Sequence, residues 1–331
     1  MIEFTRRAAL AGVAATTLVP LAGGTWARAG APLADKQAPG FYRYNIGTHQ
    51  ITVVSDGITV APRADNYVVN ASKDEVSKAF ADNYLPPDKA THSYNPIVIN
   101  TGSKLVVVDT GLGPATYEQS KGKAGQFQTN LAAAGIDRNS VDTVIISHFH
   151  GDHINGLLTA DNKAAYPNAE IMVPSAEWKF WMDDGEMSKG TGNPILEGNF
   201  KNSRRVFDAL GRKVTQYDAG KELAPGIASV ASPGHTPGHT SFVVTSGSEK
   251  LLVQVDITAG AAFLFVKNPE WQAVFDVDKP LAVQTRRKLY DMAIAEKMPI
   301  QAFHAGFPGL VRVEKDGNGY RWIPALWNSS L

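Results

Sequence analysis

The hydrophobic residues of this chain gather in short apolar runs that are separated by glycine, proline and polar residues. In the first half, four runs rich in valine and isoleucine predict strands: residues 51–54, 97–99, 104–108 and 141–147. Residues 126–134 have helical spacing and stop at Gly135, which predicts a helix between the last two strands. Those two strands lead into Asp109 and His148. Polar side chains therefore stand at strand ends, where open sheets commonly place ligands.

The second half of the chain repeats this pattern. Its apolar runs predict strands at residues 227–231, 241–245, 250–255 and 300–303, and a helix at residues 279–296. A sheet from each half, packed face to face with helices outside, predicts an α/β (α+β) two-layer sandwich. Two aromatic or apolar clusters, residues 178–182 and 263–266, fall outside the clearest strands. Core packing is the commoner meaning of such clusters, but loops that carry them over a site would form an apolar substrate pocket.

The first 29 residues have the features of an export signal. Arg6-Arg7 precedes a stretch rich in alanine, leucine and valine, and Ala27-Arg28-Ala29 is a small-x-small cleavage site. The stretch is too short and too interrupted for a good membrane span, so we expect no stable membrane anchoring. The paired arginines favour the twin-arginine route, and an ordinary secretory signal is the alternative. We expect an exported protein, periplasmic or secreted, with a mobile leader at residues 30–40 and a single domain over residues 30–331.

Composition narrows the class of protein and of site. The chain has 331 residues, of which 44% are hydrophobic, so it is long and apolar enough to bury a core. Lys plus Arg and Asp plus Glu both number 32, and this balance predicts a small-molecule substrate rather than nucleic acid. Cysteine is absent, which excludes disulfides and thiolate chemistry. A metal site would have to use imidazole and carboxylate groups, and the chain has eight histidines.

The most specific motif follows the predicted strand at residues 141–147. It reads His148-Phe149-His150-Gly151-Asp152-His153, three imidazoles and a carboxylate within six positions. His148 and His150 lie two apart, so in an extended segment both side chains point the same way and can bind one cation. Gly151 permits a tight turn that directs Asp152 and His153 toward a second cation. The alternative is a polar loop that only caps a helix beginning near Ile154, with Asp152 as its N-cap.

Four residues cannot complete two metal sites, so further ligands must lie downstream. The loop at residues 232–239 is stiffened by glycine and proline and offers His235 and His239. Asp256 ends a predicted strand, where a carboxylate can bridge two cations, and His304 follows another strand. Each residue alone is more often a hydrogen-bonded structural group, but together they form one pattern.

These motifs resemble the metallo-β-lactamase superfamily, whose H-x-H-x-D-H signature is followed by a later His, Asp and His. The resemblance covers nearly all of the chain after the export signal and implies the αββα sandwich of that superfamily. It implies two metal sites and a bridging residue: His148, His150 and His235 at one site, Asp152, His153 and His304 at the other, and Asp256 between them. It also implies that Asp109 supports the metal loop from behind, and it leaves His239 as a supporting or structural residue.

Within the superfamily the chain looks most like the branch of methyl parathion hydrolase and quorum-quenching lactonases. The segments that carry this likeness are residues 54–57, 100–102, 108–111, 232–240 and 304–309. The likeness implies a homodimer and places Trp181 over the substrate, and we expect Phe263 and Phe265 to line the same pocket. The chain departs from the branch at residues 257–259, Ile-Thr-Ala, which lack the pocket tyrosine of many acyl-homoserine lactonases and the histidine of methyl parathion hydrolase.

The hypothesis is a binuclear hydrolase. Two divalent cations about 3.5 to 4 Å apart share a water whose pKa falls toward neutrality, and the bridging hydroxide attacks a lactone, an ester-like bond or a phosphotriester. Asp152 can orient this nucleophile or carry a proton, although a metal ligand is a poor free base. With mixed imidazole and carboxylate ligands, Zn²⁺ is the first choice, and Mn²⁺, Co²⁺ or Fe²⁺ would also fit.

Three other interpretations use the same residues. A mononuclear-iron oxidoreductase on this fold would need fewer ligands than the full set that ends at His304. A β-lactamase would also be exported, but residues 55–57 and 304–309 resemble the lactonase branch instead. The third is a non-catalytic metal-binding protein that has kept the fold. The complete set of candidate ligands argues against loss of the catalytic activity. Metal content and turnover of any ester distinguish these classes.

Overall fold

The computed structural model describes residues 33–35 and 37–331, and residues 38–331 form one compact unit. The predicted export signal at residues 1–29 lies outside the described residues. Residues 37–40 have no regular secondary structure and lead directly into the first strand. None of the described helices combines the length and the apolar character that a membrane crossing requires.

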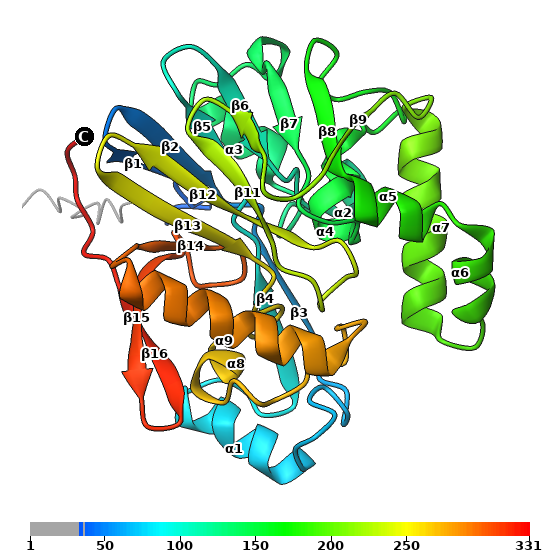
Figure 1. Ribbon diagram of the computed structural model, residues 1–331, viewed down its shortest axis with the longest axis vertical. Helices are drawn as coiled ribbons and strands as arrows, with labels where there is room; N and C mark the ends of the chain where they lie inside the picture. Colours follow the sequence, from blue (N-terminus) through cyan, green and yellow to red (C-terminus); the bar gives the residue numbers. More distant parts are fainter. Residues whose placement is uncertain (1–32, 36) are drawn as a thin grey trace, which may run out of the picture. The chain divides into compact units, whose positions relative to one another are not determined.

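The first sheet has seven strands in the order β1-β2-β5-β6-β7-β8-β9 (Figure 1). Their bounds are β1 Phe41–Ile46, β2 His49–Val54, β5 Ile97–Asn100, β6 Leu105–Val108, β7 Thr143–Ile145, β8 Glu170–Pro174 and β9 Thr215–Tyr217. The strands from β1 to β6 pair antiparallel, and those from β6 to β9 pair parallel. The parallel part brings the carboxyl ends of β6 and β7 to the same edge of the sheet.

The second sheet also has seven strands, in the order β10 to β16. Their bounds are β10 Glu222–Ala224, β11 Ile227–Ala231, β12 Thr240–Ser246, β13 Glu249–Val255, β14 Ile300–Ala302, β15 Leu310–Asp316 and β16 Gly319–Pro324. Only β13 and β14 pair parallel within it. A separate two-stranded sheet pairs β3 (Ile58–Pro62) with β4 (Lys89–Ser93). The expectation of two mixed sheets is confirmed.

The two large sheets pack face to face, as the alternation of their side chains requires. Along β6, Val106 and Val108 enter the layer between the sheets, whereas Val107 packs on the outer face. Along β13, Leu251 and Val253 enter the same layer. β6 is apolar on both sides because one side meets the other sheet and the other side meets helices.

Helices cover the outer faces of the sandwich (Figure 1). Their bounds are α1 Lys73–Asp82, α2 Pro114–Gln119, α3 Phe127–Ala133, α4 Gly151–Ile154, α5 Ser175–Trp181, α6 Asp184–Lys189, α7 Pro194–Ala209, α8 Phe263–Lys267 and α9 Lys279–Ala295, with short 3₁₀ turns at Arg138–Ser140 and Asn155–Leu157. Residues of α3, α5 and α7 pack on the first sheet, and residues of α9 pack on the second. The layers are therefore helix, sheet, sheet and helix.

Most of the predicted elements lie where the apolar runs placed them, within one or two residues at each end. The run at 141–147 differs by two residues at both ends, because the strand β7 is only three residues long and the chain beyond it turns toward the site. The aromatic clusters at 178–182 and 263–266 are not loops: they form α5 and α8. Both helices bury part of their apolar face in the core, so the interpretation as core packing is confirmed and the alternative of loops over a substrate pocket is wrong.

Candidate metal centre

The candidate metal-binding motif begins three residues after β7 and spans the turn into α4. His150 is the N-cap of α4 and has extended backbone, with φ −69° and ψ 154°. His148 and His150 therefore stand on an extended segment, while Asp152 and His153 lie in the first turn of the helix. This change of backbone direction sends the two pairs of side chains to neighbouring positions, as the sequence predicted.

The other three predicted ligands come from the second sheet. His235 lies in the loop from β11 to β12, Asp256 directly follows β13, and His304 lies two residues beyond β14. β13 and β14 are the one parallel pair of this sheet, so Asp256 and His304 emerge at the same edge. All three side chains are buried or nearly so, with exposed fractions of 3–7%.

His148, His150 and His235 form the first cluster, with their ligand atoms within 4.8 Å of one another. His150 Nδ1 lies 3.2 Å from His148 Nε2 and 2.8 Å from His235 Nε2. Three buried imidazole nitrogens therefore converge on one point. Convergent imidazole nitrogens are a common zinc-binding arrangement.

Asp152, His153, Asp256 and His304 form the second cluster, again with ligand atoms within 4.8 Å. Asp152 Oδ2 lies 3.4 Å from the Nε2 atoms of both His153 and His304. Asp256 Oδ1 lies 3.4 Å from His153 Nε2, and its Oδ2 lies 3.0 Å from His304 Nε2. This cluster combines two carboxylates with two imidazoles.

Asp256 also reaches the first cluster. Its Oδ2 lies 3.4 Å from His235 Nε2 and 4.0 Å from His148 Nε2. One carboxylate thus contacts side chains of both clusters, which is the position that the resemblance assigns to a bridging ligand.

Hydrogen bonds at the far side of two rings, those of His148 and His235, fix which nitrogen faces the first cluster. Ser147 donates its hydroxyl to Asp109 Oδ2 at 2.7 Å, so its oxygen accepts from His148 Nδ1 at 3.0 Å. His235 Nδ1 donates to the carboxylate of Asp276 at 2.8 Å. The Nε2 lone pairs of both rings therefore point into the cluster.

The same arrangement holds for the second cluster. His153 Nδ1 donates to Asp109 Oδ2 at 2.8 Å, and His304 Nδ1 donates to the carbonyl oxygen of Ser93 at 2.8 Å. His153 Nε2 and Asp256 Oδ1 are fully buried and have no hydrogen-bond partner among the described residues. Buried atoms without partners are costly unless a cation satisfies them, so the residues present fit a metal ion.

The electrostatics of the two clusters also favour cations. Burial, reinforced by His153, holds the pKa of His148 well below its usual value, so this imidazole is neutral and free to bind a metal. Burial opposes positive charge on His304, but Asp256 and Asp152 more than offset it and raise the pKa of that imidazole. The field at the second cluster therefore stabilises positive charge, whether a proton or a metal ion supplies it.

His239 lies behind the centre. Its Nδ1 donates to Ser232 at 2.8 Å, and its Nε2 accepts the backbone N–H of Asp256 at 3.0 Å. Burial lowers the pKa of His239 to about 3, with His235 adding to the effect, so the ring is neutral as these two bonds require. His239 thus positions the backbone of Asp256.

Two buried carboxylates that support the centre escaped the sequence analysis. Asp276 holds His235, and the loop that carries it pairs with the His235 loop through the N–H of Val277, which donates to the His235 carbonyl. Glu177 accepts from the backbone N–H groups of Phe149 and Gly238, so it joins both histidine loops. Neither residue lies in a motif, and only the fold brings them to the site.

A cavity of about 270 Å³ opens over the two clusters. Its polar lining includes His92, Asn155 and Asn199 beside the metal-ligating side chains. Its apolar and small lining residues are Tyr94, Leu112, Gly151, Ile195, Ala259, Gly260 and Phe275. The centre is therefore accessible to a small molecule through a wall that is partly apolar.

The three residues predicted to contact substrate do not line this cavity. Trp181 is fully buried and donates Nε1 to Glu177 at 2.7 Å, with its ring 6.1 Å from that of His150. Phe265 is fully buried in α8, and Phe263 packs against Phe80 of α1. The structure instead places Tyr94 and Phe275 in the wall.

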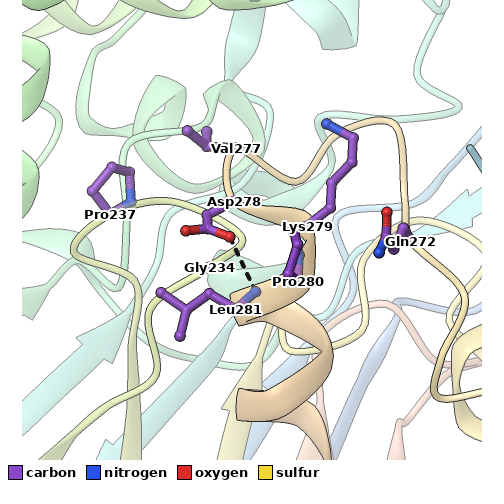
Figure 2. A pocket seen from close by; sticks show the side chains of 8 residues that line it. All are labelled: Gly234, Pro237, Gln272, Val277, Asp278, Lys279, Pro280 and Leu281. Carbon is purple, nitrogen blue, oxygen red and sulfur yellow. Dashed lines mark hydrogen bonds between the residues drawn. The ribbon is translucent and has the colours of Figure 1, made fainter.

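A second hollow, of about 620 Å³, lies outside the His235 loop (Figure 2). It is lined by Gly234, Pro237, Gln272, Val277, Asp278, Lys279, Pro280 and Leu281. Figure 2 shows the carboxylate of Asp278 turned to the Leu281 N–H, and this 3.0 Å bond caps α9. Lys279, the other charged residue of this wall, donates Nζ to the Asp276 carbonyl oxygen at 2.9 Å. Both charged groups are thus occupied, and the candidate metal clusters of the described residues lie elsewhere.

We expect Asp276→Asn to weaken the first metal site and Asp109→Asn to weaken both. Asp276 orients His235, whereas Asp109 accepts from His153 Nδ1 and from the Ser147 hydroxyl that orients His148. Loss of such a partner typically costs about 10- to 100-fold in metal affinity. Competition of Zn²⁺ with a chelator should show one weakened and one unchanged ion in Asp276→Asn, and two weakened ions in Asp109→Asn. Unchanged affinities in both single variants would contradict this assignment.

Comparison with protein families agrees with the geometry. The family described as the metallo-beta-lactamase superfamily matches residues 91–268. An N-acyl homoserine lactonase of Bacillus sp is 26% identical over 216 residues, which cover 63% of this chain and 75% of the relative. The N-acyl homoserine lactonase AttM of Rhizobium johnstonii is 31% identical over 135 residues, covering 38% of this chain and 44% of that one.

Two solved structures illustrate the similarity of the whole fold. AidC, a dizinc quorum-quenching lactonase in complex with a product, N-hexanoyl-L-homoserine, has a TM-score of 0.80 and 25% identity, and the match covers 88% of this chain and 99% of AidC. The hydrolase AbOPH has a TM-score of 0.79 and 26% identity, covering 89% of this chain and 100% of that chain.

Proposed function

The chain belongs to the metallo-beta-lactamase superfamily, and we propose that within it this metal-dependent hydrolase uses two divalent cations to open the lactone ring of N-acyl homoserine lactones. The observation that carries the proposal is the convergence of seven side chains, six of them buried, into two clusters that share Asp256. A centre for one ion would leave one of these clusters without a role.

The relatives support a lactone as the substrate class. The curated relatives at 24–31% identity are N-acyl homoserine lactonases, and AidC holds the ring-opened product of such a substrate. Hydrolysis of phosphotriesters stays a prediction from the branch resemblance.

Two bound cations supply Lewis acidity and lower the pKa of a shared water. The chain's own residues do the rest. Asp152 is 20% exposed at the cavity, and, although burial opposes ionisation, His153 keeps its pKa below the usual range. Its carboxylate therefore stays ionised as a ligand and is a weak proton acceptor. Leu112, Ile195 and Phe275 offer apolar surface to an acyl chain.

We expect metal-replete protein to hydrolyse N-hexanoyl homoserine lactone and His150→Ala to lose about 10³-fold in kcat/KM, since one ligand of the first cluster is removed. The substrate preference is measured with a panel of aliphatic lactones, an aryl ester, a phosphotriester and a cephalosporin, followed by product analysis. Chelator treatment should abolish turnover, and Zn²⁺, Mn²⁺ or Co²⁺ should restore it. Equal turnover of the whole panel by wild type and His150→Ala would contradict the proposed site.

Two further properties belong to this proposal. We propose export, from the signal-like residues 1–29, and a homodimer, from the branch resemblance. Cell fractionation of the full-length chain and light scattering of the purified protein measure them.

A further inference from the structure

His92 lies in the cavity beside the second cluster but belongs to neither cluster. It is on β4, and the carbonyl of the next residue, Ser93, accepts the hydrogen bond that orients His304. The rings of His92 and His304 are 6.4 Å apart. The backbone that fixes a metal ligand thus also fixes His92 at the edge of the centre.

A short chain of hydrogen bonds sets the tautomer of His92. The backbone N–H of Ala261 donates to Tyr67 Oη at 2.7 Å, and Tyr67 Oη lies 2.8 Å from His92 Nε2. No other acceptor for the Tyr67 hydroxyl is found among residues 37–331, so its proton must go to His92 Nε2. His92 Nε2 is then an acceptor, and the proton of the neutral ring is on Nδ1.

The state of both groups agrees with this assignment. Burial, reinforced by His304, lowers the pKa of His92 to about 4, so the ring is neutral. Burial raises the pKa of Tyr67, so its hydroxyl keeps its proton. Within the described part of the chain Nδ1 makes no hydrogen bond, yet it is not among the fully buried polar atoms that lack partners. A donor with one fixed orientation therefore remains accessible in the cavity.

The surroundings hold the pair rigidly. The ring of Phe275 packs edge-on against both, with its centroid 5.3 Å from that of Tyr67 and 5.9 Å from that of His92. Gly260 has φ +62°, and a Cβ there would lie 2.5 Å from Tyr67 Oη and 3.2 Å from His92 Nε2. The loop after β13 therefore needs glycine to approach the Tyr67–His92 pair.

We propose that His92 is a catalytic residue that donates its Nδ1–H to an oxygen of the substrate at the edge of the metal centre. The inference rests on the proposed function and adds a contact to it. Negative charge develops on the carbonyl oxygen when a lactone is attacked, and a preorganised neutral donor stabilises that charge without being reoriented. The chain lacks a tyrosine at residues 257–259. His92 supplies a hydrogen-bond donor from the two-stranded sheet of β3 and β4 instead.

The test compares His92→Leu with His92→Asn in zinc-loaded protein. Asparagine keeps an N–H donor near the position of Nδ1, whereas leucine keeps only the bulk. We expect His92→Leu to lose about 10- to 100-fold in kcat for N-hexanoyl homoserine lactone, and His92→Asn to stay within about fivefold of wild type. Both variants should bind two Zn²⁺ per chain. Full activity of His92→Leu, or equal losses in both variants, overturns the proposal.

Imidazole ¹⁵N NMR gives a measurement that does not depend on turnover. We expect a pyrrole-type Nδ1 and a pyridine-type Nε2 at His92, and a shift of the Nδ1 signal on addition of N-hexanoyl-L-homoserine. The opposite tautomer, or no shift, overturns the proposal. If wild type leaves every lactone intact, the proposed function fails, and the NMR result still decides whether His92 contacts an acyl homoserine ligand.

Discussion

Replacing Asp256 by alanine is expected to lower kcat/KM for N-hexanoyl homoserine lactone by at least about 10³-fold and to reduce bound Zn²⁺ from two ions per chain to one or none. The reason is that its two oxygens lie 3.0–3.4 Å from imidazoles of both clusters, so one substitution removes a ligand from each ion. Three orders of magnitude correspond to about 4 kcal/mol, the range expected when metal stabilisation of a transition state is lost. Elemental analysis and steady-state kinetics measure the two effects.

Asp218→Asn is the matched control for this variant, because Asp218 is an exposed carboxylate that belongs to neither cluster and does not line the cavity over them. It should keep both ions and full activity. Circular dichroism should show that Asp256→Ala is folded, since the carboxylate contacts the imidazoles of the two clusters and the variant leaves those rings in place. Two tightly bound ions and wild-type turnover in Asp256→Ala would rule out a bridging role.

Replacing Glu177 by alanine is expected to lower the free energy of unfolding by about 3 to 5 kcal/mol. The buried carboxylate accepts from Phe149 N at 2.9 Å, from Gly238 N at 2.6 Å and from Trp181 Nε1 at 2.7 Å. Alanine leaves all three donors without an acceptor, and each unsatisfied buried donor costs about 1 to 3 kcal/mol. Urea unfolding of chelator-treated protein measures the loss without a contribution from bound metal.

Two further variants test whether the loss of stability comes from the missing acceptor. Glu177→Gln keeps one acceptor oxygen and should lose less than the alanine variant. Glu249→Ala, at an exposed position in the β12–β13 hairpin, should stay within about 0.5 kcal/mol of wild type. A loss below about 1 kcal/mol for Glu177→Ala would mean that water or a rearranged loop satisfies the three donors.

Three of the candidate ligands, His148, Asp256 and His304, could be predicted from the sequence because each lies within three residues of a strand end. Apolar runs mark the strands β7, β13 and β14, and a polar residue that follows such a run emerges near the sheet edge. The positions of His148, Asp256 and His304 are therefore fixed by local patterns. Their assignment to two ions came from the family resemblance, and the two clusters agree with it.

The cavity wall could not be predicted in the same way. Trp181 and Phe265 have the composition of a substrate pocket, yet both are buried because their helices use these residues as core. The wall contains Tyr94, Phe275 and Ile195 instead, which come from three distant segments. No local pattern distinguishes an aromatic ring that faces a cavity from one that packs in a core.

One supporting carboxylate, Asp276, could not be predicted for a different reason. Asp109 belongs to an Asp-Thr-Gly motif after β6 and was predicted, whereas Asp276 precedes α9 in a segment with a second aspartate, Asp278. One of the two caps the helix and the other holds His235. Only tertiary pairing of the two loops decides between them.

Each cluster draws its side chains from both sheets, with His148, His150, Asp152 and His153 from the first and His235, Asp256 and His304 from the second. Neither half of the polypeptide can assemble a complete coordination sphere by itself. High-affinity uptake of metal therefore has to wait until the halves have docked. Bound ions would then hold the two halves together. The rate of zinc binding during refolding would report the last step of tertiary assembly.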